Sequence, residues 1–289
     1  MIEAETLACS EACAGEPLAG TASEATLFAA LAWPKARWHA DKPALSEGLP
    51  PAVGELGRAA KRAGKQLQLR LFDRGAAAAS EGVEVVCADF AAGRTLAARA
   101  NDAEGAAALM AAFVAGETAG PPLAAPLVLV CTDGKHDRCC GKLGRSLFAA
   151  LRGRLDVAEA SHLGGHRLAP NCLALPSGRL YGRVGANDVG GLVDAILHDR
   201  VYLPCYRGRS GLAELAQVAE AAALARFPGA RGAELSSDGK RVRVALSDGE
   251  LERRLEVECA QEEHLGIGSC GDAEPERRVR WRAAAVRVV

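Results

Sequence analysis

A chain of 289 residues of which 49% are hydrophobic is long enough to bury a sizeable core, and its length suggests roughly two domains of ordinary size. The formal net charge of -1 and a pI near 6.6 exclude a general attraction to nucleic acid or to an anionic membrane. Any charged docking surface must therefore be local.

The N-terminal stretch MIEAETLACSEACAGEPLAG begins with acidic residues and lacks the cationic start and the apolar run of a secretion signal. No later segment approaches the roughly twenty uninterrupted apolar residues that span a bilayer. We therefore expect a cytoplasmic protein that does not bind membranes. A reducing compartment keeps most thiols free, so ligation or redox chemistry explains a cluster among the ten cysteines better than structural disulfides do.

Residues 1–120 show the pattern of an α/β region. Strands are predicted for three apolar or alternating stretches, TLFAALAW at 26–33, QLQLRLF at 66–72 and VEVVCADF at 83–90. Asn101 or Asp102 can cap the alanine-rich helix that follows, and residues 118–126, TAGPPLAAP, are typical of a linker. For this N-terminal α/β region, a degenerate thioredoxin-like half is one interpretation.

Residues 121–228 form a second predicted α/β region. The apolar run LVLV leads into a cysteine-rich loop, and GRSLFAALRGR at 144–154 has helical spacing. The stretch NCLALPSGRLYGRV at 171–184 predicts a hairpin that turns at Pro176, Ser177 and Gly178. Two helices are expected behind it, over 188–198 and 211–227. A strand, a ligand loop, helices and a hairpin are the parts of a thioredoxin-like layer.

Residues 229–289 differ from the rest, because RVRVAL, LEVEC and RVRWRAAAV alternate polar and apolar side chains. Such segments should pair as a small antiparallel sheet. The expected fold class is thus α/β, with a thioredoxin-like domain between an N-terminal α/β region and a β-rich C-terminal extension.

Two loops of the second region carry four soft or borderline metal ligands. CTDGKHDRCCG holds Cys131 and Cys140 with eight residues between them, and SHLGGHRLAPN holds His162 and His166 with three between them. Thiolate and imidazole suit zinc, copper or an iron-sulfur cluster, and they disfavour magnesium and calcium. The glycine pair between the histidines favours a loop, since each glycine costs about 1 kcal/mol in a helix interior.

A single buried cysteine or core histidine needs no ligand role, and Cys87 and Cys172, in strand-like stretches, are expected to be small buried side chains. The joint occurrence of both ligand pairs beside glycine-rich turns favours a metal site. On spacing alone, a Cys2His2 zinc site and a 2Fe-2S cluster fit about equally well.

The motif CTDGKHDRCCG resembles that of the sucrase/ferredoxin-like family, thioredoxin-like 2Fe-2S ferredoxins whose loop reads Cys-Thr-x-Gly-x-Arg-Asp-x-x-Cys-Gly. SHLGGHRLAPN resembles the His-x-Gly-Gly-His loop of the same family. Three further segments are similar to family segments: ACSEACAGEPLAGTA near the N-terminus, CYRGRSGL at 205–212 and GSCGDA at 268–273. The resemblance covers nearly the whole chain and departs at His136, where the family usually has arginine.

The resemblance implies that Cys131 and Cys140 ligate one iron of a 2Fe-2S cluster and that His162 and His166 ligate the other. Cys139 is then expected to be a spectator, because the family register favours Cys140 and adjacent side chains diverge. Two ferric ions, two sulfides and two thiolates sum to zero formal charge, which should raise the reduction potential. An imidazole that keeps an N–H can lose that proton on oxidation, so reduction should be coupled to protonation.

The expected function is electron transfer, with no bond-making step of its own. A local basic cluster is expected to dock an acidic redox partner protein, and it consists of Lys135, Arg138, Lys142 and Arg145. Arg207 and Arg209 either reach the cluster or brace a turn, and the sequence assigns no role to Cys9, Cys13, Cys205 or Cys270. The alternatives are a structural zinc module of Cys2His2 type and, with less support, a thiol-disulfide oxidoreductase. Oxidoreductases of that kind normally carry Cys-x-x-Cys, whereas three residues separate Cys9 from Cys13.

Overall fold

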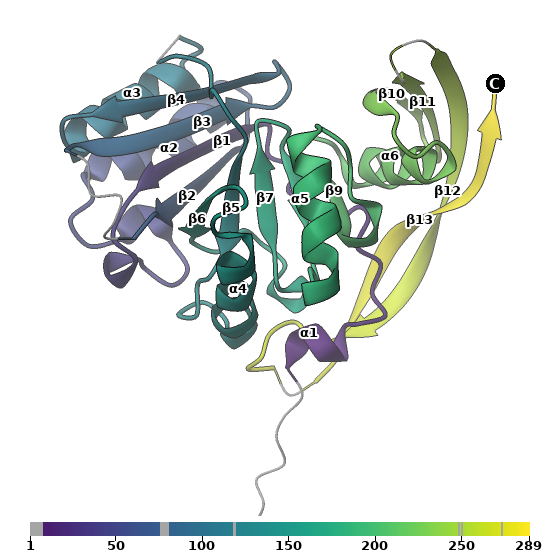
Figure 1. Ribbon diagram of the computed structural model, residues 1–289, viewed down its shortest axis with the longest axis horizontal. Coiled ribbons are helices and arrows are strands. Elements are labelled where there is room, and N and C mark those ends of the chain that lie inside the picture. Colours follow the sequence, from purple (N-terminus) through teal and green to yellow (C-terminus); the bar gives the residue numbers. More distant parts are fainter. Residues whose placement is uncertain (1–7, 76–80, 118–119, 248, 250, 273) are drawn as a thin grey trace, which may run out of the picture.

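The computed structural model describes residues 8–75, 81–117, 120–247, 249, 251–272 and 274–289. The chain is a mixed α/β protein with one large curled sheet of nine strands and a separate antiparallel sheet of four (Figure 1). The order in the large sheet is β4-β3-β1-β2-β6-β5-β7-β8-β9, and in the small sheet it is β10-β11-β12-β13. The predicted α/β class and the predicted C-terminal antiparallel sheet are therefore confirmed.

The first half of the large sheet comes from the N-terminal region. Its elements are β1 (Leu27–Ala32), α2 (Pro51–Arg62), β2 (Leu67–Asp73), β3 (Val83–Asp89), β4 (Arg94–Ala100) and α3 (Ala103–Val114). β1 pairs in parallel with β2 and antiparallel with β3, and β3 pairs antiparallel with β4. Asp102 caps α3 as predicted, since its carboxylate accepts a hydrogen bond from the backbone N–H of Gly105 at 2.8 Å.

The second half repeats this connectivity. Its elements are β5 (Leu127–Cys131), α4 (Arg138–Leu151), β6 (Asp156–Ala160), β7 (Cys172–Leu175), β8 (Arg179–Tyr181) and α5 (Val189–Leu197), followed by β9 (Tyr206–Arg209) and α6 (Glu214–Arg226). β5 pairs in parallel with β6 and antiparallel with β7, and β7 pairs antiparallel with β8. The two halves meet where Phe72 of β2 pairs with Ala160 of β6, so one sheet runs through both.

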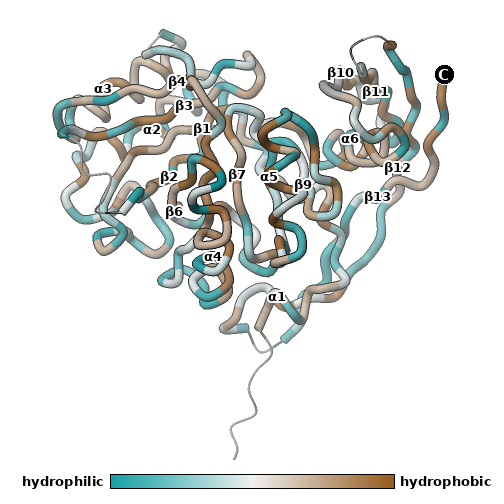
Figure 2. The backbone as a smooth tube through the Cα atoms, in the orientation of Figure 1, coloured by the Kyte–Doolittle hydropathy of each residue, from teal (hydrophilic) through white to brown (hydrophobic). Residues whose placement is uncertain are grey.

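Each half buries both faces of its strands. On β1, Leu27 and Leu31 pack in a core with residues of α2 and α3, while Phe28 faces the opposite way. That opposite face shares one core with the equivalent face of the second half, which includes Leu129 and Cys131 of β5. The curl of the sheet therefore brings its two halves together, and Figure 2 shows hydrophobic residues gathered around β2, β5 and β6.

The helix predicted for 144–154 begins earlier than the sequence suggested, at Arg138. The carboxylate of Asp137 accepts a hydrogen bond from the backbone N–H of Cys139 at 2.8 Å and so caps α4. The glycines in this part of α4 weaken the helical pattern of the sequence, so its start was not predicted. Gly144 is needed for packing, because a Cβ there would lie 1.9 Å from the carbonyl oxygen of Cys131. Part of the predicted linker, 118–126, packs on the sheet, because Pro122 forms a bridge with Leu96 of β4. Residues 118–119 lie outside the described residues.

The small sheet consists of β10 (Arg231–Asp238), β11 (Arg241–Ser247), β12 (Glu252–Gly266) and β13 (Glu276–Val288), with α6 packed against it. β12 and β13 are much longer than predicted. They run beyond the sheet as a hairpin whose loop reaches α1 (Cys9–Ala12), as Figure 1 shows. In the part of the chain that the structure describes, no helix is both long and apolar enough to cross a membrane.

Candidate metal centre

Three of the four predicted ligands meet at the end of β5. Cys131 is the last residue of that strand, Cys140 lies in the first turn of α4, and His162 follows β6. The Nδ1 atom of His162 is 3.9 Å from the Sγ of Cys131 and 3.7 Å from the Sγ of Cys140. These three ligand atoms all lie within 4.8 Å of one another, close enough to hold one metal ion.

His166 lies beside this group, in the short turn that follows Gly165. Its ring centroid is 5.5 Å from that of His162, and the two rings are nearly perpendicular. Its Nδ1 atom is 2.9 Å from Oδ2 of Asp137. One ring nitrogen is thus engaged by a carboxylate, which leaves Nε2 for a metal. Ligation by His166 stays a prediction.

His136, which stands where the family usually has arginine, also faces the site. Its ring stacks on that of His162 with the centroids 3.7 Å apart. Its Nδ1 atom is 3.0 Å from the exposed carboxylate of Asp41. His136 is not part of the group of three potential ligands. Its ring instead packs over the ring of His162.

The two thiols of the site shift each other's pKa in opposite directions. The hydrogen bond from Cys140 lowers the pKa of Cys131, against the opposing effect of burial, and nearby His162 lowers it further. The pKa of Cys140 is raised, because its proton is held against the neighbouring sulfur and its side chain is buried. Burial lowers the pKa of His162. A neutral imidazole beside a thiol that ionises more easily than usual is a suitable starting state for binding a metal.

Two arginines place positive charge around the site. Arg207 donates hydrogen bonds to the carbonyl oxygen of Gly164 at 2.9 Å and to Oδ1 of Asn171 at 2.8 Å, so it braces the histidine loop. Burial lowers the pKa of Arg207 to about 9, which still leaves it charged at neutral pH. Arg70 acts electrostatically on Cys131, and its buried Nε atom has no hydrogen-bond partner among the described residues. Arg209, by contrast, pairs with Glu220 at 3.0 Å.

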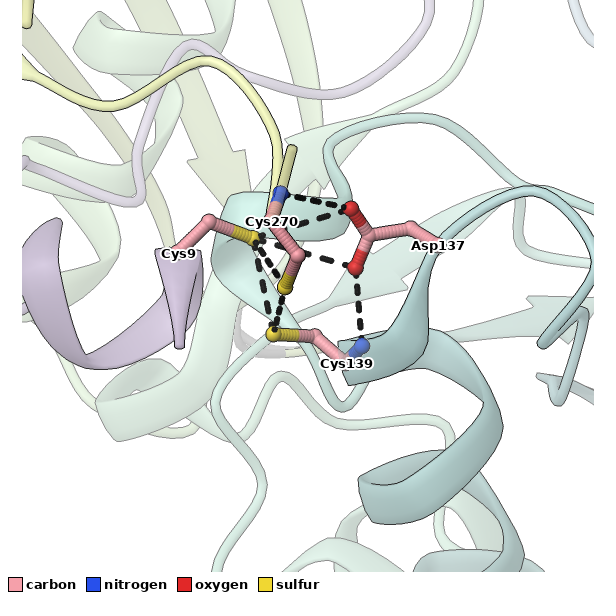
Figure 3. Close-up of side chains that lie close together, drawn as sticks. All are labelled: Cys9, Asp137, Cys139 and Cys270. Atoms are coloured by element: carbon pink, nitrogen blue, oxygen red, sulfur yellow. Dashed lines mark hydrogen bonds between the residues drawn. The ribbon is translucent and has the colours of Figure 1, made fainter. Parts of the chain in front are cut away.

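The structure contains a second group of potential ligands that the sequence did not predict. Figure 3 shows Cys9, Asp137, Cys139 and Cys270 with their side chains turned toward one another, and their ligand atoms also lie within 4.8 Å of one another. The segments around Cys9 and Cys270 resemble family segments, and this resemblance is the sequence signal that points to them. Nothing in their spacing indicated that they meet.

The remaining cysteines are separate thiols. Cys87 and Cys172 are buried in strands as predicted, and burial raises the pKa of Cys87 to about 12. Cys13 donates a hydrogen bond to the carbonyl oxygen of Ile267 at 3.2 Å, and burial raises the pKa of Cys205 to about 12. None of the ten cysteines, all of which lie in the described ranges, is paired in a disulfide.

The predicted basic cluster divides into two parts. Arg138, Lys142 and Arg145 are exposed on α4, the helix that carries Cys140. Lys135 instead holds the ligand loop in place, because its Nζ donates to the carbonyl oxygens of Ala36 at 2.8 Å and of Trp38 at 2.9 Å.

Comparison with known proteins agrees with the motifs. The model of the family described as Sucrase/ferredoxin-like matches residues 18–208, which include all four predicted ligands. Altered inheritance of mitochondria protein 32 from Debaryomyces hansenii is 34% identical over 95 residues, a match that covers 28% of this chain and 35% of that relative. The chain thus spans about a third of the relative's length. No solved structure matches this chain. Because the family model covers well over half of the residues, this chain belongs to the sucrase/ferredoxin-like family.

Proposed function

We propose that this protein is an electron-transfer protein that binds a 2Fe-2S cluster through Cys131, Cys140, His162 and His166. The observation that carries the proposal is the convergence of two thiols from β5 and α4 on the ring of His162, with the ring of His166 next to it. Membership of the sucrase/ferredoxin-like family supports it.

The surroundings of the four side chains fit such a cofactor. Thiolates and imidazoles are the ligands that iron-sulfur centres of mixed type use. The charges of half-buried Arg70 and buried Arg207 favour a group that becomes more negative on reduction. The strand orders β4-β3-β1-β2 and β8-β7-β5-β6 support our assignment of both halves as thioredoxin-like layers.

The protein's own residues would do three things around the bound group. Cys131 and Cys140 would lose their thiol protons and bind as thiolates. Asp137 would hold the Nδ1 proton of His166 and direct its Nε2 atom toward iron. His162 and His166 remain partly exposed, so protons can exchange with solvent as the charge of the site changes. When bound, a 2Fe-2S cluster supplies one-electron redox chemistry.

We also propose that Arg138, Lys142 and Arg145 form the docking face for an acidic redox partner. They lie on the helix that carries Cys140, so a partner bound there would be near the cluster. Replacing Lys142 and Arg145 with glutamate should slow oxidation of the reduced protein by the anion ferricyanide at low salt. Replacing the exposed Arg62 of α2 with glutamate should have little effect, and equal slowing by both changes would contradict the docking face.

A cytoplasmic location remains part of the proposal. Ten free cysteines, most of them buried, support a reducing compartment. Whole-cell fractionation would test the location directly.

The first test is an absorption spectrum of protein purified without oxygen. A 2Fe-2S cluster gives a red-brown solution with iron and acid-labile sulfide near two each per chain, whereas zinc at this site would leave it colourless. A redox titration across pH then tests the proton coupling. We expect the potential to fall as pH rises, and a potential independent of pH would remove the coupling.

A further inference from the structure

We propose that Cys9, Cys139, Cys270 and Asp137 form a second metal site, distinct from the 2Fe-2S site, and that it binds zinc. The three sulfur atoms lie 3.4 Å (Cys9 to Cys139), 3.1 Å (Cys139 to Cys270) and 3.5 Å (Cys270 to Cys9) apart. The two carboxylate oxygens of Asp137 lie 3.8 and 3.9 Å from the sulfur of Cys9. The four side chains thus surround one small volume (Figure 3).

These distances match a tetrahedral zinc site. Zinc–sulfur bonds of about 2.3 Å at tetrahedral angles place neighbouring sulfurs about 3.8 Å apart. Movements of a few tenths of an ångström would therefore admit the ion. A disulfide, with its bond of about 2.05 Å, joins only two sulfurs and would leave the third thiol and the carboxylate unused. Three thiolates and one carboxylate suit zinc and not magnesium or calcium.

The three cysteines come from distant parts of the chain. Cys9 lies in α1, Cys139 in the first turn of α4, and Cys270 in the loop between β12 and β13. The sequence separations are 130, 131 and 261 residues, so local chain geometry does not cause the convergence. The N-terminal segment and the β12–β13 loop therefore both reach the helix that also carries Cys140.

The site is buried where the ion would sit and open on one side. Cys9 is fully buried, and Cys139 is 2% exposed, while Cys270 is partly exposed and offers a path for the ion. The hydroxyl of Ser10 lies 3.4 Å from the sulfur of Cys139 and can donate a hydrogen bond to a thiolate. Hydrogen bonds of this kind orient and stabilise metal ligands.

Asp137 connects this site to the proposed cluster. Its Oδ1 atom accepts a hydrogen bond from the N–H of Cys139 at 2.8 Å, and its Oδ2 atom accepts from the N–H of Cys270 at 3.0 Å and from His166 at 2.9 Å. An ionised carboxylate has about four lone-pair sites, so Oδ1 can still bind an ion. The two sites are therefore neighbours that share Asp137, which would be a ligand of the second site and a positioning residue for His166.

The adjacent cysteines of α4 provide the experiment. The full chain is expressed with iron and zinc in the medium, and both metals are measured by mass spectrometry. We expect about one zinc per chain in addition to iron. Cys139→Ser should lower zinc at least tenfold and retain iron, whereas Cys140→Ser should lose iron and retain zinc.

Cys9→Ser and Cys270→Ser show whether an effect of Cys139→Ser comes from loss of the site or from a folding defect of that variant alone. Loss of zinc with retention of iron in either variant supports the site. Loss of both metals in all three variants, or zinc unchanged by all three, would overturn it. A wild-type chain that contains no zinc and shows a disulfide among these cysteines by intact mass would also overturn it.

The two proposals can fail separately. If the cluster assignment is wrong, Cys140→Ser still carries zinc that Cys139→Ser lacks. As a second readout, cobalt added to the metal-free Cys140→Ser chain should produce thiolate-to-cobalt absorption. The same titration in Cys9→Ser/Cys140→Ser should not, and equal absorption in both chains would contradict the site.

Discussion

The carboxylate of Asp137 lies 2.9 Å from Nδ1 of His166 and accepts a hydrogen bond from its N–H. Burial would raise the pKa of Asp137, but hydrogen bonds from the Cys270 N–H, the His166 ring and the Cys139 N–H together lower it, so the carboxylate is ionised at neutral pH. An ionised carboxylate can only accept, which places the proton on Nδ1 and leaves Nε2 of His166 available for iron.

Asp137→Asn should raise the reduction potential of the iron site. The change removes a negative charge beside His166 and weakens the hydrogen bond that makes its ring electron-rich, and both effects favour the reduced state. A redox titration measures the shift. Asp41→Asn is the matched control, because it removes the carboxylate that contacts His136 instead, and its potential should stay close to that of the wild type. Equal shifts in the two variants would show that the His166 contact has no special role.

His162→Cys and His166→Cys should each keep a cluster and lower its potential. A thiolate adds negative charge where a neutral imidazole stood, which disfavours uptake of an electron. The lowering should reach about 100 mV or more, since four-cysteine clusters lie hundreds of millivolts below those with two histidines. An unchanged spectrum and potential in both variants would refute the assignment of these histidines as ligands.

His136→Ala should retain iron near the wild-type content. The ring of His136 covers His162 at a centroid distance of 3.7 Å but is not part of the ligand group. Its removal opens the site, so the cluster should bleach faster in air, as followed by visible absorption. His162→Ala serves for comparison and should lose the cluster. Equal iron loss in both variants would make His136 a ligand instead.

Gly144→Ala should destabilise the fold by about 3 kcal/mol or more, because overpacking against backbone has no easy relief. The new Cβ would lie 1.9 Å from the carbonyl oxygen of Cys131 and push α4 away from β5. Gly57→Ala in α2 is the control, since nothing lies within 4 Å of its Cβ position and it should stabilise the helix by about 1 kcal/mol. Urea unfolding measures both changes. A neutral Gly144→Ala would mean that α4 does not pack this closely.

Glu16→Gln should destabilise the protein by about 3 kcal/mol at neutral pH. The neutral amide would leave the cationic Arg167 and Arg280 without the buried carboxylate that they pair with. Glu16 accepts hydrogen bonds from Arg167 at 2.6 and 2.7 Å and from Arg280 at 3.1 Å. It thereby joins the N-terminal segment to the histidine loop and to β13.

The same carboxylate predicts a dependence on pH. Burial raises the pKa of Glu16, but the two arginines outweigh it and the pKa is lowered. A lowered pKa in the folded state gives stability that is fully present above the unfolded pKa of about 4.3 and is lost as pH falls below it. The difference in unfolding free energy between wild type and Glu16→Gln should therefore shrink below about pH 4. A difference that stays constant down to pH 3 would contradict this account.

The amino-acid sequence by itself determined the elements and the motif whose signals are local. Apolar runs and alternation predicted β1, β2 and β3 to within a residue or two, and Asn101 or Asp102 was expected to cap α3, which Asp102 does. The Cys131–Cys140 and His162–His166 pairs were recognisable because each lies within one short stretch of sequence. Where glycines obscured the helical pattern, as at the start of α4, the prediction of the boundary was wrong.

Only the tertiary structure decided which distant residues meet. No local pattern reports that β2 pairs with β6, that Asp137 contacts His166, or that Arg207 braces the histidine loop. Cys139 shows the difference most clearly, because the sequence presents it as a surplus neighbour of Cys140. In the fold, neighbouring helix positions point in different directions. Cys140 therefore faces Cys131, while Cys139 faces Cys9 and Cys270, which long-range packing brings to it from the N-terminal segment and the β12–β13 loop.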